Sequence, residues 1–276
     1  MKQRIIVSII AIPILVLVII FAPVWVLGIL IGAIAALAAY ELLSCAAPDL
    51  KLRQQIYVML AAFAIGLLTA FFDSGTVIAI AAFALFALMF CEMMLTFGKE
   101  LVMPFSVVTT TVFAGIIMPI LITSIVRLAL LPNGAAFALV PFVAAFSSDS
   151  GAYFSGIFLG KHKLAPNLSP KKSIEGSIGG FLSAIVIMLL YGLILKALGY
   201  SVNFAVMGVY GFLGSLVCQI GDLSFSAVKR MAGVKDYGSL IPGHGGVLDR
   251  FDSMFWTAAM IEILVNFVPA FSKIVE

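Results

Sequence analysis

The stretch from Ser226 to Asp252 carries the side chains best suited to chemistry. Only 11% of the chain is charged, yet this stretch holds four of its sixteen Lys and Arg, three of its thirteen Asp and Glu, and one of its two His. Lysine and arginine neutralise phosphate charge, and arginine does so with a bidentate fork. The basic residues are Lys229, Arg230, Lys235 and Arg250. This composition indicates a phosphate-binding site.

Carboxylates and glycines accompany these basic residues. They are Asp222, just upstream, and Asp236, Asp249, Asp252, Gly243, Gly245 and Gly246. Mg²⁺ is typically held by one or two carboxylates together with substrate phosphates. Glycine lets backbone N–H groups approach an anion closely, because it has no Cβ. A solvated connecting loop with a Pro-Gly turn is the alternative interpretation.

The order of these residues resembles the signature of the phosphatidate cytidylyltransferase (CDP-diacylglycerol synthase) family. The matching residues are Ser226, Lys229-Arg230, Lys235-Asp236, Gly238, Pro242, His244-Gly245-Gly246, Asp249-Arg250 and Asp252. The resemblance implies an integral membrane enzyme of phospholipid synthesis, which uses CTP and phosphatidate to form CDP-diacylglycerol and pyrophosphate. It also implies that Asp222 and Asp249 coordinate Mg²⁺, with Asp236 and Asp252 as further candidate ligands, and it leaves a second cation open. The other catalytic residues that it implies are Lys229, Arg230, Lys235, Asp236, His244 and Arg250. His244 either donates to a phosphate or fixes a turn.

Asp149 and Tyr153 form a second candidate group, because they share a helix face at positions i and i+4. Asp149 lies about eleven residues before Lys161, on the order of 15 Å inside the expected helix end. A carboxylate at that depth is costly unless it faces a polar cavity or a partner. Both a structural polar pair between helices and a helix that lines a water-filled cavity stay open.

The loop from Gly160 to Gly176 brings four lysines to the same end of that helix. Its block Ser169-Pro-Lys171-Lys172-Ser173-Ile-Glu175-Gly176 resembles a second stretch of the same family, as does the helix from Asp149 to Tyr153. The resemblance implies substrate binding by Lys171, Lys172 and Ser173, together with Asp149, Tyr153, Ser226, Gly245, Gly246 and Asp252. Attraction of anionic lipid headgroups is the alternative role of the lysines.

The composition independently predicts a membrane protein. The chain is 63% hydrophobic with mean hydropathy +1.21, whereas about half of a soluble domain is apolar. Its charges recur at intervals near the roughly 20 residues that cross a bilayer core. We therefore expect an all-α bundle in a single domain, 1–276, with the catalytic half at about 141–276. Cys45, Cys91 and Cys218 form no CxxC pair, and we expect buried free thiols.

Nine membrane spans are predicted. Two short spans share Ile5 to Tyr40 and turn at Ala22-Pro23, and the others are Gln54–Phe72, Gly75–Phe97, Phe105–Leu130, Ala135–Leu159, Ile174–Leu195, Phe204–Gly221 and Ser253–Phe271. We also expect a short interfacial helix at Ser224–Met231. Before Asp149 no residue is assigned to the site: Glu92 and the pair Gly28 and Gly32 are interpreted as structural.

The distribution of basic residues predicts the orientation. With a cytoplasmic amino terminus, 13 of the 16 Lys and Arg lie inside and three, Arg127, Lys196 and Lys273, lie outside or at span ends. This is the bias of the positive-inside rule. We therefore expect an active site that faces the cytoplasm, with the protein in a bacterial inner membrane.

Other functions stay open at this stage. A related enzyme would transfer CMP to another lipid phosphate or phosphorylate a lipid alcohol, and an ion-coupled transporter would use Asp149 and Asp222 as ion sites. The expected partners are CTP, phosphatidate and the bilayer, with no nucleic acid, and a homodimer is left open.

Overall fold

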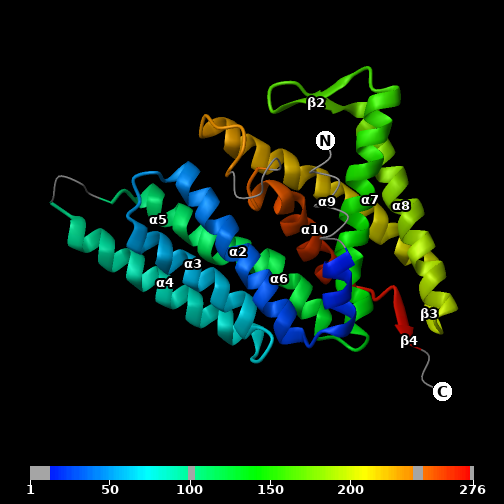
Figure 1. The fold of residues 1–276 in the computed structure, drawn as a ribbon, viewed down its shortest axis with the longest axis horizontal. Helices are drawn as coiled ribbons and strands as arrows, with labels where there is room; N and C mark the ends of the chain where they lie inside the picture. The colour runs from blue at the N-terminus through cyan, green and yellow to red at the C-terminus, as the bar shows by residue number, and fades with distance from the viewer. Residues whose placement is uncertain (1–12, 99–102, 239–244, 274–276) are drawn as a thin grey trace. The chain divides into compact units, whose positions relative to one another are not determined.

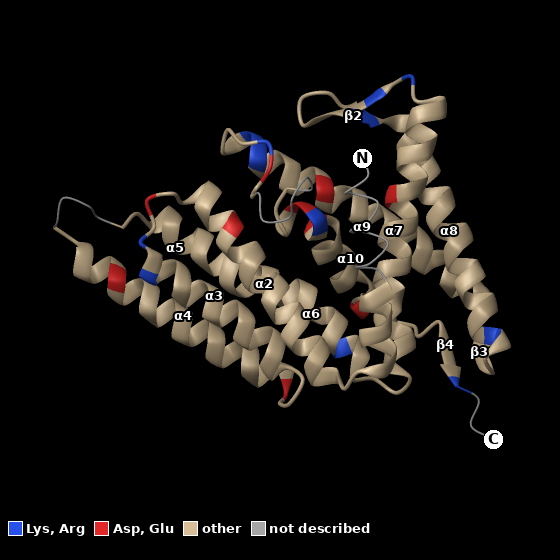
Figure 2. Cartoon of the chain, viewed as in Figure 1, with Lys and Arg blue, Asp and Glu red and all other residues tan. Residues whose placement is uncertain are grey.

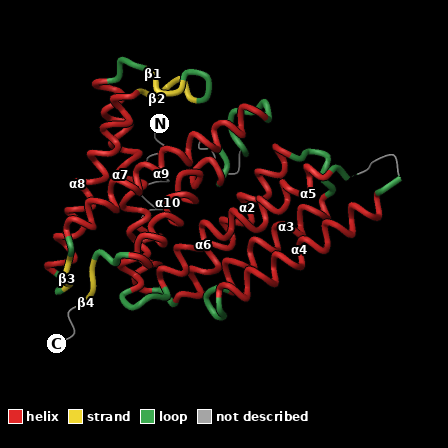
Figure 3. Tube along the Cα trace, turned by 180° about the vertical axis from the view of Figure 1, so that it is seen from behind, coloured by secondary structure: helices red, strands yellow, loops and turns green. Residues whose placement is uncertain are grey.

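The computed structural model describes residues 13–98, 103–238 and 245–273. Helices make up most of the chain, as the red segments of Figure 3 show, and residues 13–21 are helical. The later helices are α2 (Val24–Ala46), α3 (Leu52–Leu68), α4 (Ser74–Thr96), α5 (Phe105–Val112), the π-helix η1 (Phe113–Ile117), α6 (Met118–Ala129), α7 (Gly134–Leu159), α8 (Ile174–Ala197), α9 (Phe204–Met231) and α10 (Leu248–Phe267) (Figure 1). The prediction of an all-α membrane bundle is confirmed.

Within the described residues, six helical segments are long and apolar enough to cross a membrane, and Figure 2 shows how few charges they carry. They are α2, α4, α5 to α6, α7, α8 and α9. Helix α3 is shorter, at 17 residues, and α10 carries Asp249, Arg250, Asp252 and Glu262. Each of the nine predicted ranges contains a helix in the described part of the chain, but nine crossings stay a prediction.

Several predicted boundaries are wrong, among them the end at Phe72, since α3 ends at Leu68. Helix α9 runs without interruption to Met231, so the predicted span end at Gly221 lies inside a helix and Ser224–Met231 is its last part. Helix α10 begins at Leu248 and ends at Phe267, and Phe271 lies in a strand. Charged residues mark the end of an apolar run, whereas a backbone helix continues as long as its N–H and C=O groups stay paired.

The chain divides into two compact units. The first comprises Met1–Leu130 with Met231–Phe251, and the second comprises Leu131–Arg230 with Asp252–Glu276. The interpretation as one domain stays a prediction.

Small residues set the packing of the first unit. Helices α2 and α3 lie side by side (Figure 1), and a Cβ at Gly32 would lie 2.7 Å from the carbonyl oxygen of Phe63. At Gly66 a Cβ would lie 2.6 Å from the backbone nitrogen of Gly32. The expected structural role of Gly28 and Gly32 is confirmed, because only small residues allow so close a helix approach.

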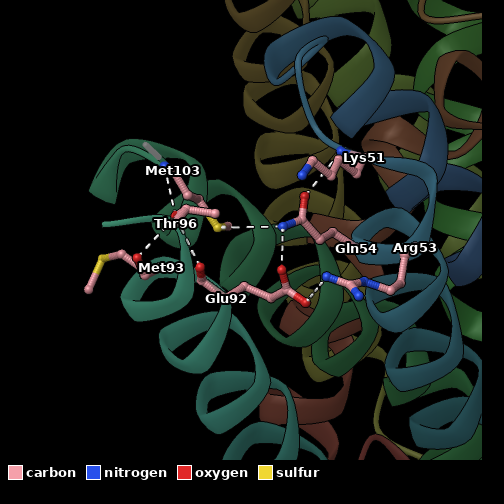
Figure 4. A network of polar contacts seen from close by, with 7 residues as sticks. All are labelled: Lys51, Arg53, Gln54, Glu92, Met93, Thr96 and Met103. Carbon is pink, nitrogen blue, oxygen red and sulfur yellow. Dashed lines mark hydrogen bonds and ion pairs between the residues drawn. The ribbon is translucent and has the colours of Figure 1, made fainter. Parts of the chain in front are cut away.

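A polar network joins α3 and α4 in the same unit (Figure 4). Glu92 forms an ion pair with Arg53 and accepts a hydrogen bond from Gln54 Nε2 at 3.2 Å. Thr96 Oγ1 accepts the N–H of Met103 at 3.2 Å, beyond the end of α4. The structural interpretation of Glu92 is therefore confirmed.

In the second unit, α7 and α8 pack along a row of glycines. A Cβ at Gly151 would overlap the Ser183 side chain and lie 2.8 Å from the carbonyl oxygen of Gly179. At Gly176 a Cβ would lie 2.9 Å from the carbonyl oxygen of Ala152. This close approach places the residues of α7 and of the α8 start beside one another.

Two short antiparallel strand pairs were not predicted; Figure 3 shows them in yellow. Strand β1 (Lys163–Ala165) pairs with β2 (Ser169–Ser173), and β3 (Tyr200–Val202) pairs with β4 (Phe271–Lys273). Three to five residues per strand are too few for a periodic hydrophobic pattern, so sequence indicated only loops.

The three cysteines, all in the described part of the chain, form no disulfide, as expected, but only Cys218 is buried. The prediction of buried thiols is wrong for Cys91, which is exposed on α4, and for Cys45, which is half-buried. A thiol behaves as a small apolar group, so the outer face of a membrane helix tolerates it.

Candidate active site

A cavity of about 420 Å³ in the second unit contains six of the residues singled out from sequence. They are Asp149 and Tyr153 from α7, Lys171, Lys172 and Ser173 from β2, and Asp222 from α9. Gly156, Gly176, Ser177 and Gln219 are among the other lining residues. The cavity lies within the size range of small-molecule sites, roughly 300–1,000 Å³.

Asp222 and Lys172 form an ion pair in this cavity. Lys172 Nζ lies 2.5 Å from Asp222 Oδ2, and about a quarter to a third of each side chain is exposed. Ser226, one turn later in α9, donates a hydrogen bond to Asp222 Oδ1 at 3.3 Å. Because both charged groups stay accessible, either can exchange its partner for a ligand.

Two further carboxylates lie in the electrostatic field of Asp222. Asp149 faces the cavity and accepts a weak hydrogen bond from Cys218 Sγ at 3.5 Å, while Asp252, at the start of α10, is buried. The negative charge of Asp222 repels both carboxylates. The positive charge of Lys172 offsets this repulsion at Asp149, and that of Lys229 offsets it at Asp252. The site therefore combines acids from three helices with lysines that offset part of their charge.

Gln219 is a cavity residue that sequence reasoning missed. Ser177 Oγ donates to its Oε1, and its Nε2 donates to the Ser177 carbonyl at 3.2 Å and to Ser215 Oγ at 3.3 Å. An amide in an apolar helix three residues before Asp222 is a signal that could have found it, since i and i+3 share a face. Gln219 thereby fixes α8 against α9 at the cavity wall.

The hairpin β1–β2 positions the lysines. Ser173 is the N-cap of α8, and its Oγ accepts the N–H of Gly176 at 3.1 Å. Glu175 accepts the N–H groups of Lys161 and His162 at 3.0 and 3.2 Å. Arg230 Nε donates to the Leu168 carbonyl at 3.3 Å and so ties the end of α9 to the hairpin turn. Figure 2 shows basic residues in blue on and near β2.

The rest of the signature belongs to the first unit. Asp249 Oδ2 accepts the N–H groups of Tyr237 and Gly246 at 2.8 and 2.9 Å. Glu41 of α2 accepts the N–H groups of Val247 and Leu248 at 2.9 and 2.7 Å. Lys235, Asp236 and Arg250 are exposed, Gly245 is half-buried and Gly246 is buried. His244 and Gly243 lie outside the described residues.

These contacts change the interpretation of the signature glycines. The anions that approach the main chain at positions 245 to 248 are the carboxylates of Asp249 and Glu41. Glu41 carries no motif and lies more than 200 residues away, so sequence gave no reason to assign it.

The donor set suits Mg²⁺ at Asp222. Its carboxylate is accessible in the cavity, and Mg²⁺ needs only one or two protein carboxylates when phosphates supply the remaining oxygens. Among the described residues, no three His, Cys, Asp or Glu side chains converge as a complete metal site. Asp249 belongs to the other unit, so joint coordination by Asp222 and Asp249 stays a prediction.

Comparison with known proteins gives concordant results. A sequence model of the family described as "Cytidylyltransferase family" matches residues 2–268. A protein of Staphylococcus aureus (strain COL) is 43% identical over 138 residues, and one of Staphylococcus haemolyticus (strain JCSC1435) is 38% identical over 133 residues. Both are named phosphatidate cytidylyltransferase. Each match covers 48% of this chain and 50% of the relative, about half the length of both.

Proposed function

Because the chain belongs to the cytidylyltransferase family, we propose that it transfers CMP from CTP to phosphatidate. The products are CDP-diacylglycerol and pyrophosphate. The observation that carries this proposal is the cavity in which Lys171, Lys172, Asp149 and Asp222 meet within an apolar helix bundle. A lipid phosphate and a nucleotide need such a place, where charged groups are accessible beside lipid-facing helices.

The chemistry needs little acid–base assistance. The second pKa of a phosphate monoester is near 6, so phosphatidate is mostly dianionic at neutral pH. Its phosphate oxygen attacks the α-phosphorus of CTP; the new O–P bond forms as the bond to the β-phosphate oxygen breaks, and that electron pair leaves with pyrophosphate. The protein must mainly hold two anions in line and offset their charge.

Lys171 and Lys172 are placed for that task. Both line the cavity, and Lys172 can release Asp222 when a phosphate offers a more negative partner. Asp222 and Asp249 would hold Mg²⁺, which when bound offsets phosphate charge. Ser226 would then orient the Asp222 carboxylate through its hydrogen bond.

The proposed reaction also bears on which membrane holds the protein and on which side of it the cavity opens. The protein is an integral membrane protein, and we propose that its cavity opens to the cytoplasm from a bacterial inner membrane. The lysine excess on the loops of that side supports this orientation, and CTP is available there.

The test uses purified protein in detergent with CTP, Mg²⁺ and phosphatidate. Pyrophosphate release that requires phosphatidate, with a lipid product that carries label from the cytidine of CTP, supports the proposal. Label transfer from the γ-phosphate of a nucleotide to a lipid alcohol would identify a lipid kinase. Acceptance of another lipid phosphate in place of phosphatidate would identify the related transferase, and absence of any nucleotide chemistry would favour a transporter.

A further inference from the structure

Helix α10 begins at a residue whose own side chain cannot cap it. The Val247 carbonyl accepts the N–H of Arg250 at 3.0 Å and that of Phe251 at 3.2 Å, so Val247 takes the N-cap position. The valine side chain carries no hydrogen-bond acceptor, although N-cap positions prefer Ser, Thr, Asp or Asn, whose side chains accept N–H groups of the first turn. The N–H groups of Val247 and Leu248 are nevertheless paired.

Glu41 supplies the missing acceptor from α2. One carboxylate oxygen lies 2.9 Å from the Val247 nitrogen and the other 2.7 Å from the Leu248 nitrogen. The residue is 5% exposed, so water cannot replace it without rearrangement. Asp249 holds the neighbouring main chain through the N–H of Gly246. Two carboxylates thus fix the backbone from Gly246 to Leu248.

The Glu41 carboxylate also explains why two positions of the signature are glycine. A Cβ at Gly238 would lie 2.7 Å from Glu41 Oε1, and a Cβ at Gly246 would lie 2.6 Å from it. Neither glycine has a positive φ, so the backbone itself would accept alanine at both positions. Gly245 differs, because its φ is +85°. Gly238 and Gly246 therefore make room for Glu41, whereas Gly245 serves the turn.

We propose that Glu41 is a positioning residue of the active site. It acts through the main chain, by holding the segment that carries Asp249 and Arg250. The inference rests on the proposed function for its link to catalysis, but the contact itself can be tested without any activity.

The first experiment compares Glu41→Gln with Glu92→Gln, a buried acid of the same unit that binds α3 instead of the signature. Glutamine keeps the size but offers one acceptor oxygen, which leaves a buried N–H unpaired. We expect kcat/KM of Glu41→Gln to fall roughly ten- to a hundredfold.

Trypsin should cut faster after Lys235, while cleavage after Lys163 in β1 stays near the parental rate.

The controls separate positioning from general destabilisation. Glu92→Gln should leave cleavage at Lys235 unchanged. General destabilisation would speed up the cuts after Lys235 and Lys163 equally, and parental cleavage at Lys235 would overturn the proposal. If no CDP-diacylglycerol forms even with the parent, the proposed function fails, while the cleavage pattern still decides on Glu41.

A double-mutant cycle provides the second experiment. Gly246→Ala should reduce kcat/KM about tenfold or more in the parent, equivalent to at least about 1.4 kcal/mol. In the Glu41→Asp background it should cost much less, because the shorter acid leaves room for the methyl group. The rate of tryptic cleavage after Lys235 is measured in the same four proteins, which are the parent, the two single variants and the double variant. Gly245→Ala should be equally harmful in both backgrounds, since its strain lies in φ. Equal costs of Gly246→Ala in both backgrounds would refute the role of Glu41.

Discussion

At the scale of single residues, the pair of Lys172 and Asp222 defines what the cavity can bind. An accessible ion pair contributes little to stability, because water screens it and ordering two side chains costs entropy. Because Asp149 and Lys171 line the same cavity, the pair fits the ligand-binding role proposed above better than a role in stability. Each partner can pair with a group of the opposite sign when substrate enters.

Lys172→Ala should weaken activity without unfolding the protein. Loss of a charge-assisted hydrogen bond of about 1.5–3 kcal/mol corresponds to a fall in kcat/KM of roughly ten- to a hundredfold. The control is Lys196→Ala, which removes the same charge from the last turn of α8, where the ammonium lies 5.8 Å from the centre of the Phe204 ring. Steady-state kinetics with CTP and phosphatidate measure both variants. Equal effects of the two substitutions would contradict phosphate binding by Lys172.

Asp222→Asn tests the metal proposal. Asparagine keeps one oxygen but removes the charge that attracts a hard dication. If about 4 kcal/mol of transition-state stabilisation is lost, turnover slows roughly a thousandfold, and added Mg²⁺ should restore part of it. Turnover is measured against Mg²⁺ concentration. Asp73→Asn is the control, since asparagine also caps α4 there. Near-parental turnover of Asp222→Asn at low Mg²⁺ would remove this residue from the metal site.

The site was partly predictable at this scale. Asp149, Tyr153, Lys172 and Asp222 stood out because charged and polar groups are costly in an apolar chain. Glu41 and Gln219 did not, because their partners are a distant main chain and neighbouring serines. A single sequence contains no period or spacing that reveals contacts between residues so far apart.

At the scale of elements, the close contact of α7 and α8 supports the cavity. The carbonyl oxygen of Gly179 and the side chain of Ser183 occupy the space that a side chain at Gly151 would need. The start of α8 and the hairpin that precedes it are thereby held beside Asp149 and Tyr153 of α7. A wider separation would move the two lysines of β2 away from the acids.

Gly151→Ala should therefore destabilise the second unit by about 1–3 kcal/mol through overpacking. Gly208→Ala in α9 is the matched control: nothing lies within 4 Å of its Cβ, and alanine favours a helix by up to about 1 kcal/mol. Thermal unfolding in detergent measures both. Ser183→Gly should partly restore Gly151→Ala. The interpretation fails if Gly151→Ala and Gly208→Ala unfold at the same temperature.

Helices were predictable here, and strands were not. Long apolar runs indicated the membrane helices because only paired backbones are tolerated in lipid. The continuous α9 and the β1–β2 pair depend on main-chain hydrogen bonds in a polar stretch, where composition favours no single structure. The sequence therefore identified the basic loop but not the hairpin that orients Lys172.

At the scale of the whole molecule, orientation is the main open property. The 13 to 3 distribution of basic residues predicts a cytoplasmic amino terminus and nine crossings, which place Glu276 outside. The test is a reporter enzyme that is active only outside the cytoplasm. Fused after Glu276, this reporter should give a signal. The control is the same reporter fused after Lys163, in the basic hairpin, which should give none. A cytoplasmic signal after Glu276 would contradict the odd number of crossings.

The contact of Glu41 with Val247 and Leu248 also has a consequence for synthesis on the ribosome. These partners are 206 and 207 residues apart in the chain. At roughly 5–20 residues per second, Glu41 waits about 10–40 s for the amides that it will bind. Throughout that interval Glu41 in α2 lacks the two amides that it binds in the folded protein. The main chain at Val247 and Leu248 can therefore be held by Glu41 only after nearly all of the membrane helices have been synthesised, and a chain truncated before Val247 would lack both contacts.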